Sequence, residues 1–422
     1  MSSPGRKKRP AGYLITLLVL FVGVCRAGED SQWGINTHTP TTEQLDICEE
    51  LGVGWIRVDF NWADVEAQGK KQFDWGVLDN VVEQASARNI YIYGSIAYTP
   101  PWAGASGQPS DPPTDPRDWY DFVYACVSRY SYWVHHWGMW NEPNLSQFWT
   151  GSWTDYLNLI LIPGHSAAKS AHPGCLVLGP EFSDQDIVDT LKFLDFVMAN
   201  ASDYIDIVTQ HAYGSKASDT IRLIDYFVYP VVQNQAPGKE LWLTETGWRS
   251  DTDGEDFQAL MYQEMCKGVE QTDSIKKVFF YELTDGLATE KWGIVRYPDN
   301  TRKLAFYSYQ SYISGSTPPV LYSDCFIATA VYGTPLAPEV RVLSEFRDKY
   351  LLTNTPGREF VRCYYKLGPP IARVTSRNKP LGFTVRTALR PVIILCRTIL
   401  SLFPPTAATV DVKEEDFHPN EK

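Results

Sequence analysis

The chain has 422 residues, of which 44% are hydrophobic and 21% are charged, and it contains 29 Gly and 28 Pro. This composition excludes a disordered, collagenous or polytopic membrane chain. The net charge of −12 is unevenly spread, because residues 28–319 hold 19 Lys and Arg against 40 Asp and Glu, whereas both ends of the chain are basic. We expect the acidic middle to repel nucleic acid and to favour neutral partners.

The first 27 residues have the layout of a secretory signal peptide. Basic residues from Arg6 to Arg9 precede 14 largely apolar residues from Ala11 to Val24, and Ala27 is a small residue at the predicted cleavage point. The apolar stretch is shorter than the roughly 20 residues that cross a bilayer, which argues against an uncleaved anchor. We therefore predict an exported protein that is periplasmic, cell-surface or extracellular.

From residue 32 to about 315, short β-rich segments alternate with stretches of helical periodicity, which predicts a parallel sheet with crossover helices. Helices are expected at Thr41–Leu51 and Gly76–Arg88, among others. Eight strands are expected at 32–38, 55–62, 90–99, 134–140, 175–182, 206–213, 240–246 and 277–283. Eight such units predict an α/β fold, a (β/α)₈ TIM barrel over residues 28–317. A doubly wound sheet is the alternative, although no Gly-rich phosphate loop follows the first strand.

Polar residues gather at the carboxyl ends of the predicted strands, which is where such barrels carry their active sites. The fourth strand ends in Trp140-Asn141-Glu142-Pro143-Asn144, the sixth in His211-Ala212-Tyr213, and the seventh in Thr244-Glu245-Thr246-Gly247-Trp248. Glu142 and Glu245 therefore close two strands around one cavity. Cleavage of a glycosidic bond needs such a pair, one carboxyl protonated to release the leaving oxygen and one ionised to attack the sugar carbon.

In these residues the sequence resembles the clan A glycoside hydrolases, which are retaining enzymes on a (β/α)₈ barrel. The resemblance covers most of residues 32–313 and implies that Glu142 is the general acid/base and Glu245 the nucleophile. It further implies that Asn141 binds the 2-hydroxyl of the sugar, that Arg57 keeps the nucleophile ionised, and that Tyr213 hydrogen-bonds it. We expect neither a metal nor a cofactor, since no His or Cys spacing typical of zinc sites accompanies the motifs.

Further residues are predicted to bind the sugar. His211 is either a sugar ligand or a satisfied barrel histidine, and both interpretations stay open. Glu282 ends the eighth strand, where many clan members place a Trp, so it is either a hydroxyl ligand or an ion-pair partner. Aromatic rings can stack on the apolar faces of sugars, and the candidates for this are Tyr98, Trp102, Trp140, Trp248 and Trp292.

The last hundred residues differ from the barrel in composition. The segment from Asp324 to Ala330 resembles the CFI-box, a small C-terminal module of exported microbial proteins, and residues 320–405 are predicted to form a helical module of this kind. Residues 360–410 hold eight basic residues and no acid, which predicts peripheral contact with an anionic membrane surface, a merely solvated helical domain being the alternative. The acidic tail at 406–422 is expected to be disordered.

The cysteines give no disulfide framework. Seven remain after the predicted cleavage, an odd number with no CxxC pair, and most lie in apolar patterns where a buried free thiol is expected.

Together these features predict an exported, retaining glycoside hydrolase that cleaves a β-linked oligo- or polysaccharide by double displacement. Two alternatives stay open: a catalytically silent saccharide-binding barrel, and a cell-surface scaffold whose function lies in the C-terminal module. The presence of both Glu142 and Glu245 argues against the first, because binding alone needs no matched acid and nucleophile.

Overall fold

The computed structural model describes residues 28–286, 290–316, 326–332, 337–351 and 378–402, with scattered positions between 354 and 375. Three predictions fall outside the described residues: the signal peptide at 1–27, the start of the CFI-box-like motif at Asp324 and Cys325, and the disordered tail at 406–422.

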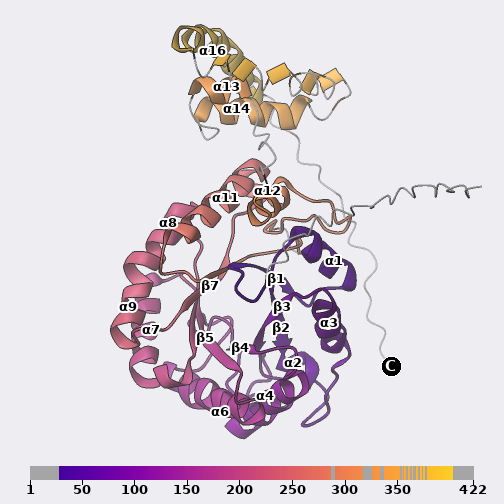
Figure 1. Ribbon diagram of the computed structural model, residues 1–422, viewed down its shortest axis with the longest axis vertical. Helices are drawn as coiled ribbons and strands as arrows, with labels where there is room; N and C mark the ends of the chain where they lie inside the picture. The colour runs from indigo at the N-terminus through magenta and orange to yellow at the C-terminus, as the bar shows by residue number, and fades with distance from the viewer. Residues whose placement is uncertain are drawn as a thin grey trace, which may run out of the picture.

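Eight parallel strands close into a barrel in sequential order, with helices around it (Figure 1). Each strand lies within the range predicted for it, so the TIM barrel is confirmed and the doubly wound sheet is excluded. The strands are β1 (Trp33–His38), β2 (Trp55–Asn61), β3 (Tyr91–Ala97), β4 (His136–Met139), β5 (Leu176–Phe182), β6 (Ile207–His211), β7 (Leu241–Thr246) and β8 (Lys277–Phe280).

Local sequence signals set the helix ends. Thr41 caps the first helix through a capping box with Gln44, and Gly52 ends it in a left-handed conformation at φ 84°. The helices around the barrel are α1 (Thr42–Leu51), α2 (Trp62–Val65), α3 (Gly76–Ala87), α4 (Pro116–Tyr130), α5 (Trp153–Asp155), α6 (Ile162–Ala171), α7 (Ile187–Ala201), α8 (Ala217–Leu223), α9 (Tyr229–Gln235), α10 (Ser250–Asp253), α11 (Glu255–Gln271) and α12 (Leu304–Ile313).

Aromatic side chains fill the amino-terminal end of the barrel. Trp55, Tyr93, Trp242 and Phe279 form a buried cluster there. The ammonium group of Lys277 lies 4.7 Å from the ring centre of Trp55 and 5.2 Å from that of Trp242. This packing fills the amino-terminal end of the barrel.

The five described cysteines are buried and unpaired: Cys48, Cys126, Cys175, Cys266 and Cys396. The expectation of buried free thiols is confirmed for these positions.

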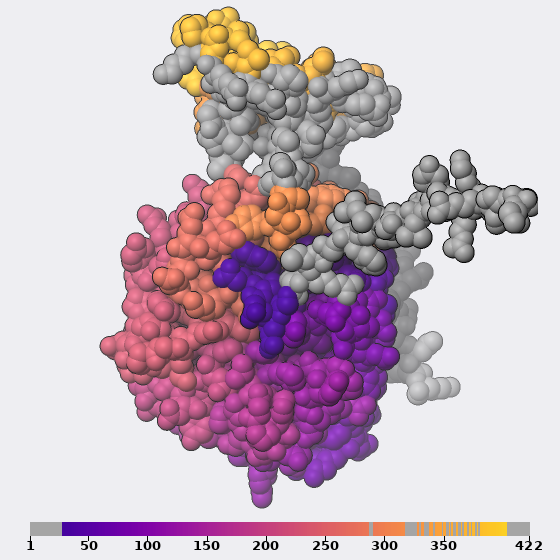
Figure 2. All heavy atoms as spheres, viewed as in Figure 1, coloured from indigo at the N-terminus to yellow at the C-terminus, as the bar shows by residue number. Residues whose placement is uncertain are grey.

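The C-terminal helices form a second body beside α11 and α12 (Figures 1 and 2). They are α13 (Phe326–Tyr332), α14 (Pro338–Phe346), which continues as a π-helical turn at Arg347–Leu351, and α16 (Lys379–Leu402). Ala328, Ala337 and Val340 form their small apolar core. The guanidinium of Arg347 lies 3.6 Å from the carboxylate of Asp256 on α11. The predicted helical C-terminal module is thus present, and no helix in the described part of the chain is long and apolar enough to cross a membrane.

Candidate active site

A pocket opens at the carboxyl ends of the strands, and its walls come from β1, β2, β3 and β7 and from the segments that follow β3, β4, β5, β6 and β8. The residues that line it are His38, Arg57, Asp59, Asn61, Ser95, Ala97, Tyr98, Asn141, Glu142, Gln147, Phe148, Ser183, Asp184, Gln185, Tyr213, Glu245, Tyr281 and Trp292.

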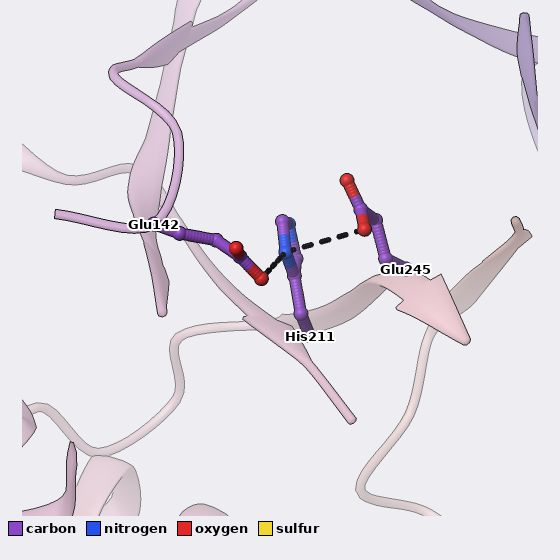
Figure 3. A group of neighbouring side chains, drawn as sticks. All are labelled: Glu142, His211 and Glu245. Atoms are coloured by element: carbon purple, nitrogen blue, oxygen red, sulfur yellow. Dashed lines mark hydrogen bonds and ion pairs between the residues drawn. The ribbon is translucent and has the colours of Figure 1, made fainter. Parts of the chain in front are cut away.

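The two glutamates predicted from the strand-end motifs face one another in this pocket (Figure 3). One carboxylate oxygen of Glu142, one of Glu245 and Nδ1 of His211 all lie within 4.8 Å of one another. Both glutamates are 8% exposed, so each is shielded from bulk water but open to the pocket. The backbone at Glu142 has φ 44°, a left-handed conformation that residues with side chains seldom adopt and that is found at functional sites.

Two donors hold the carboxylate of Glu245. Nη1 of Arg57 donates to Oε1 at 3.0 Å, and the hydroxyl of Tyr213 donates to Oε2 at 2.6 Å. Burial disfavours the charged form of Arg57, but the neighbouring carboxylates outweigh this and hold the pKa of the guanidinium above its ordinary value. Each carboxylate oxygen of Glu245 therefore accepts a hydrogen bond from a side chain of the pocket lining.

Glu142 has a different partner. Its Oε1 lies 2.9 Å from Nδ1 of His211, a fully buried residue at the end of β6. Burial lowers the pKa of His211, yet the negative charges of Glu245 and Glu142 outweigh it, so that the pKa is raised. The structure places His211 against both carboxylates, and this residue is not among those that line the pocket.

In the described part of the chain, these same three residues form a group whose nitrogen and oxygen atoms lie close enough together to bind one metal ion. Glu245 is already engaged by Arg57 and Tyr213, and Glu142 by His211. A cation would have to compete with these donors for the carboxylate oxygens.

Asn141 is fixed between two other site residues. Its Oδ1 accepts a hydrogen bond from Nη2 of Arg57 at 2.8 Å, and its Nδ2 donates to the hydroxyl of Tyr98 at 3.2 Å. All three line the pocket, so the amide is oriented before a substrate binds.

A charged group of three residues comes from β1, β2 and the segment that follows β8. His38 contacts Asp59 through Nδ1 at 2.8 Å and Glu282 through Nε2 at 3.0 Å. Burial lowers the pKa of His38, but the hydrogen bonds to Asp59 and Glu282 raise it to about 10. Glu282 thus has an ion-pair partner in His38, and its contact with a sugar hydroxyl stays a prediction.

The aromatic candidates separate into two groups. Tyr98 and Trp292 line the pocket, whereas Trp102, Trp140 and Trp248 do not. Trp140 is fully buried and donates to the Phe148 carbonyl, and Trp248 is 4% exposed and donates to the Gly214 carbonyl. Trp102 donates to the Glu66 carbonyl and packs edge-on against Trp62. Trp140 and Trp248 thus belong to the buried core and Trp102 packs against it, while stacking of these three rings on sugar stays a prediction.

Sequence reasoning missed several pocket residues. His38 and Asp59 lie at the ends of β1 and β2, and their positions at strand ends could have singled them out. Phe148, Asp184 and Tyr281 come from loops whose course no periodicity predicts.

Comparison with known proteins gives three kinds of match. Residues 140–292 match the family described as glycosyl hydrolase catalytic core. That segment holds Glu142, His211 and Glu245. A β-xylosidase from Geobacillus stearothermophilus is 30% identical over 202 residues, which are 40% of this chain and 38% of that protein. The chain thus matches well under half of the length of this curated relative.

Solved structures share the barrel. A family 39 glycoside hydrolase from Bacteroides cellulosilyticus WH2 superposes with a TM-score of 0.56 at 18% identity, covering 67% of this chain and 63% of the other. A monomeric β-xylosidase from Caulobacter crescentus CB15 superposes with a TM-score of 0.55 at 20% identity, covering 68% of each chain. At these identities the likeness concerns the fold.

Proposed function

We propose that this protein is a retaining glycoside hydrolase that cleaves a β-linked oligo- or polysaccharide by double displacement. The observation that carries the proposal is that one carboxylate oxygen of Glu142, just after β4, and one of Glu245, on β7, lie within 4.8 Å of each other inside one pocket. Carboxyl groups about 5 to 5.5 Å apart are typical of retaining enzymes, whereas inverting enzymes leave roughly 6.5 to 9.5 Å for a water molecule. The match of residues 140–292 to a glycosyl hydrolase catalytic core supports the same assignment.

In the first step Glu245 attacks the anomeric carbon while Glu142 protonates the departing glycosidic oxygen. A covalent glycosyl-enzyme forms and the aglycone leaves as an alcohol. In the second step Glu142, now a carboxylate, removes a proton from water, whose oxygen displaces Glu245 and restores the original configuration. Arg57 and Tyr213 favour the ionised form of Glu245 as it attacks and as it leaves.

Other pocket residues would hold the sugar. Asn141 is oriented to meet its 2-hydroxyl, and Tyr98 and Trp292 offer rings to its apolar faces. The pocket contains Asp59, Asp184 and both catalytic glutamates, which disfavour an anionic sugar. We therefore propose a neutral β-glycoside as substrate, and a β-xyloside is the natural first choice given the β-xylosidase among the relatives.

The decisive experiment is hydrolysis of chromogenic β-glycosides and polysaccharides, with proton NMR of the first-formed product. We expect the β-anomer to appear first and to mutarotate later. A first-formed α-anomer would exclude Glu245 as nucleophile. Binding of saccharides without any turnover would favour the silent binding barrel instead.

We propose that the glutamates and the other pocket side chains carry out hydrolysis without a metal ion. Prolonged treatment with EDTA is expected to leave the hydrolysis rate unchanged, and the alternative use of Glu142, His211 and Glu245 as metal ligands predicts a loss that added cation reverses.

We also propose that the protein is exported and that its C-terminal module contacts an anionic membrane surface. Helix α16 carries Arg386, Arg390 and Arg397 and no acidic residue. Phe383, Ile394 and Leu402 on this helix are 74%, 65% and 65% exposed. Exposed apolar side chains beside cations are typical of helices that lie in a membrane interface.

A further inference from the structure

A further buried carboxylate lies beneath the pocket, and the reaction proposed above gives it no role. Glu181 belongs to β5, is fully buried and is not part of the pocket lining. Its backbone has φ 55°, and the pairing of β5 with β6 shifts register between Pro180 and Phe182. This irregularity in the strand is a strained conformation of the kind that persists where the surrounding structure demands it.

The carboxylate of Glu181 binds Arg57 side-on. Nε of Arg57 donates to Oε1 at 3.3 Å and Nη2 donates to Oε2 at 2.9 Å. Two hydroxyls complete its surroundings, since Ser95 donates to Oε2 at 3.0 Å and Tyr93 donates to Oε1. An ionised carboxylate is thereby satisfied in a site without exposure to solvent.

The guanidinium of Arg57 is consequently shared. Its Nη1 donates to Glu245, while Nε and Nη2 donate to Glu181. Arg57 is 3% exposed, so bulk water screens neither pair strongly. Two buried carboxylates beside one positive charge repel each other. Each anion is therefore less stable than it would be if it were the single carboxylate beside Arg57.

The backbone of Glu181 reaches the other catalytic glutamate. The amide of Glu142 donates to the carbonyl of Glu181 at 3.1 Å, and the amide of Glu181 donates to the hydroxyl of Thr209 at 3.0 Å. Glu181 therefore contacts the main chain of the proposed acid/base and, through Arg57, the carboxylate of the proposed nucleophile.

We infer that Glu181 is a positioning residue that fixes the Arg57 guanidinium and limits how strongly that guanidinium stabilises the anion of Glu245. The inference rests on the proposed function, in which Glu245 must be ionised yet reactive enough to attack a sugar. A nucleophile held too tightly by its counter-charge attacks more slowly, so a second carboxylate on Arg57 keeps Glu245 reactive.

The inference makes a signed prediction for Glu181→Gln, which keeps the shape and backbone contacts of Glu181 and removes its charge. The Arg57 guanidinium then faces Glu245 and, at 4.0 Å, Asp59, so the anion of Glu245 should be stabilised more strongly than in the wild-type protein. The acid limb of kcat/KM should move to lower pH, and kcat should fall roughly tenfold while KM changes little, because Glu181 lies outside the pocket lining.

The pKa of Glu245 can be read without turnover. Protein labelled with [δ-¹³C]glutamate is titrated by NMR, and Glu245→Gln assigns the resonance. The matched control is Glu66→Gln, another buried carboxylate, which accepts from Nε1 of Trp62 at 2.5 Å and is not among the partners of Arg57. The control should leave both the resonance and the acid limb in place.

Tyr93→Phe provides a second variant with the opposite sign. Loss of the hydroxyl leaves the Glu181 anion more dependent on Arg57, so the pKa of Glu245 should rise. The inference is overturned if the Glu245 resonance titrates as in wild type in both variants, or if Glu181→Gln raises its pKa. If the resonance shifts as expected while the wild-type protein hydrolyses no glycoside, the coupling stands and the proposed function fails.

Discussion

Glu142 and Glu245 carry the same carboxyl group, but their neighbours differ. Glu245 receives a guanidinium N–H and a phenol O–H, which favour its anion. Glu142 instead faces Nδ1 of His211, whereas the guanidinium of Arg57 donates to Glu245. Neighbours of these kinds separate a nucleophile from a general acid.

Because Glu245 and Glu142 are proposed to have different roles, their alanine variants should lose activity in different ways. Glu245→Ala should lower turnover of every substrate by more than about 10⁴-fold, because no other side chain can form the covalent intermediate. Glu142→Ala should lose activity mainly on substrates whose leaving group needs a proton, and it should retain formation of the intermediate from dinitrophenyl glycosides.

Added azide tests whether Glu142 is the general acid/base. It should enter the space left in Glu142→Ala, restore the rate and yield a β-glycosyl azide, whereas Glu245→Ala should yield no β-azide. Glu264→Ala, on the exposed side of α11 beside Lys267, is the control and should keep the wild-type rate. Wild-type rates in both site variants would place the active site elsewhere.

His38 predicts a pH dependence of stability. Its folded-state pKa of about 10 lies above the ordinary value of 6.5, so the folded state binds its proton more tightly than the unfolded chain does. The stabilisation by His38 is complete below pH 6.5 and disappears as the pH rises through 10. His38→Gln should therefore lower the free energy of unfolding at pH 6 and have little effect at pH 10.5, as urea titrations at both values would measure. The same loss at both pH values would contradict a charged His38.

At the scale of the elements, the segments that follow β7 and β8 lie close together just beyond the carboxyl ends of these strands. Gly247 follows β7, and a Cβ placed on it would lie 2.2 Å from the backbone carbonyl oxygen of Tyr281. Because backbone rather than a flexible side chain occupies this space, a larger residue must push the two strand ends apart. These ends carry Glu245 and the Tyr281 and Glu282 pair.

Gly247→Ala should therefore destabilise the fold by about 1–3 kcal/mol and reduce kcat, since the strand end that carries Glu245 must shift. Chemical denaturation and steady-state kinetics measure the two effects. Gly76→Ala, whose added Cβ would meet nothing nearer than Asp74 Oδ1 at 3.4 Å, is the matched control and should behave as wild type. Equal stability of the two variants would show that the β7 and β8 ends separate without cost.

At the scale of the whole molecule, charge divides the chain into two parts. Residues 28–319 hold 19 basic against 40 acidic residues, whereas residues 360–410 hold eight basic residues and no acid. An anionic lipid surface should repel the barrel and attract the module by up to about 1 kcal/mol for each cation near it. Figure 2 shows the module projecting from the barrel, and α16 presents exposed apolar and basic side chains.

Vesicle sedimentation tests this division. The full mature chain should sediment with anionic vesicles at low salt and less with neutral ones, and a chain that ends at Ser316 should stay in solution. Arg390→Glu with Arg397→Glu in the full chain should abolish sedimentation while leaving the module's apolar residues in place. Equal sedimentation of the full and shortened chains, or none by either, would leave the module without a membrane role.

Much of the barrel and of its site follows from the sequence, because both depend on local pattern. Alternating segments placed all eight strands, and strand-end motifs placed Glu142 and Glu245 around one pocket, since the carboxyl ends of parallel strands in a barrel converge. The family resemblance pointed to Arg57, which also lines this pocket. These positions needed no knowledge of which distant side chains touch.

Tertiary structure decided what each side chain contacts. Trp140 and Trp248 stand in the right motifs, yet their rings turn into the core, because the side available to a large ring depends on loop packing rather than strand periodicity. The pairing of His38 with Glu282 requires closure of β1 onto β8. The pairing of Arg57 with Glu181 spans the barrel interior from β2 to β5, and residues 124 positions apart acquire linked charges only when the closed barrel removes the water between them.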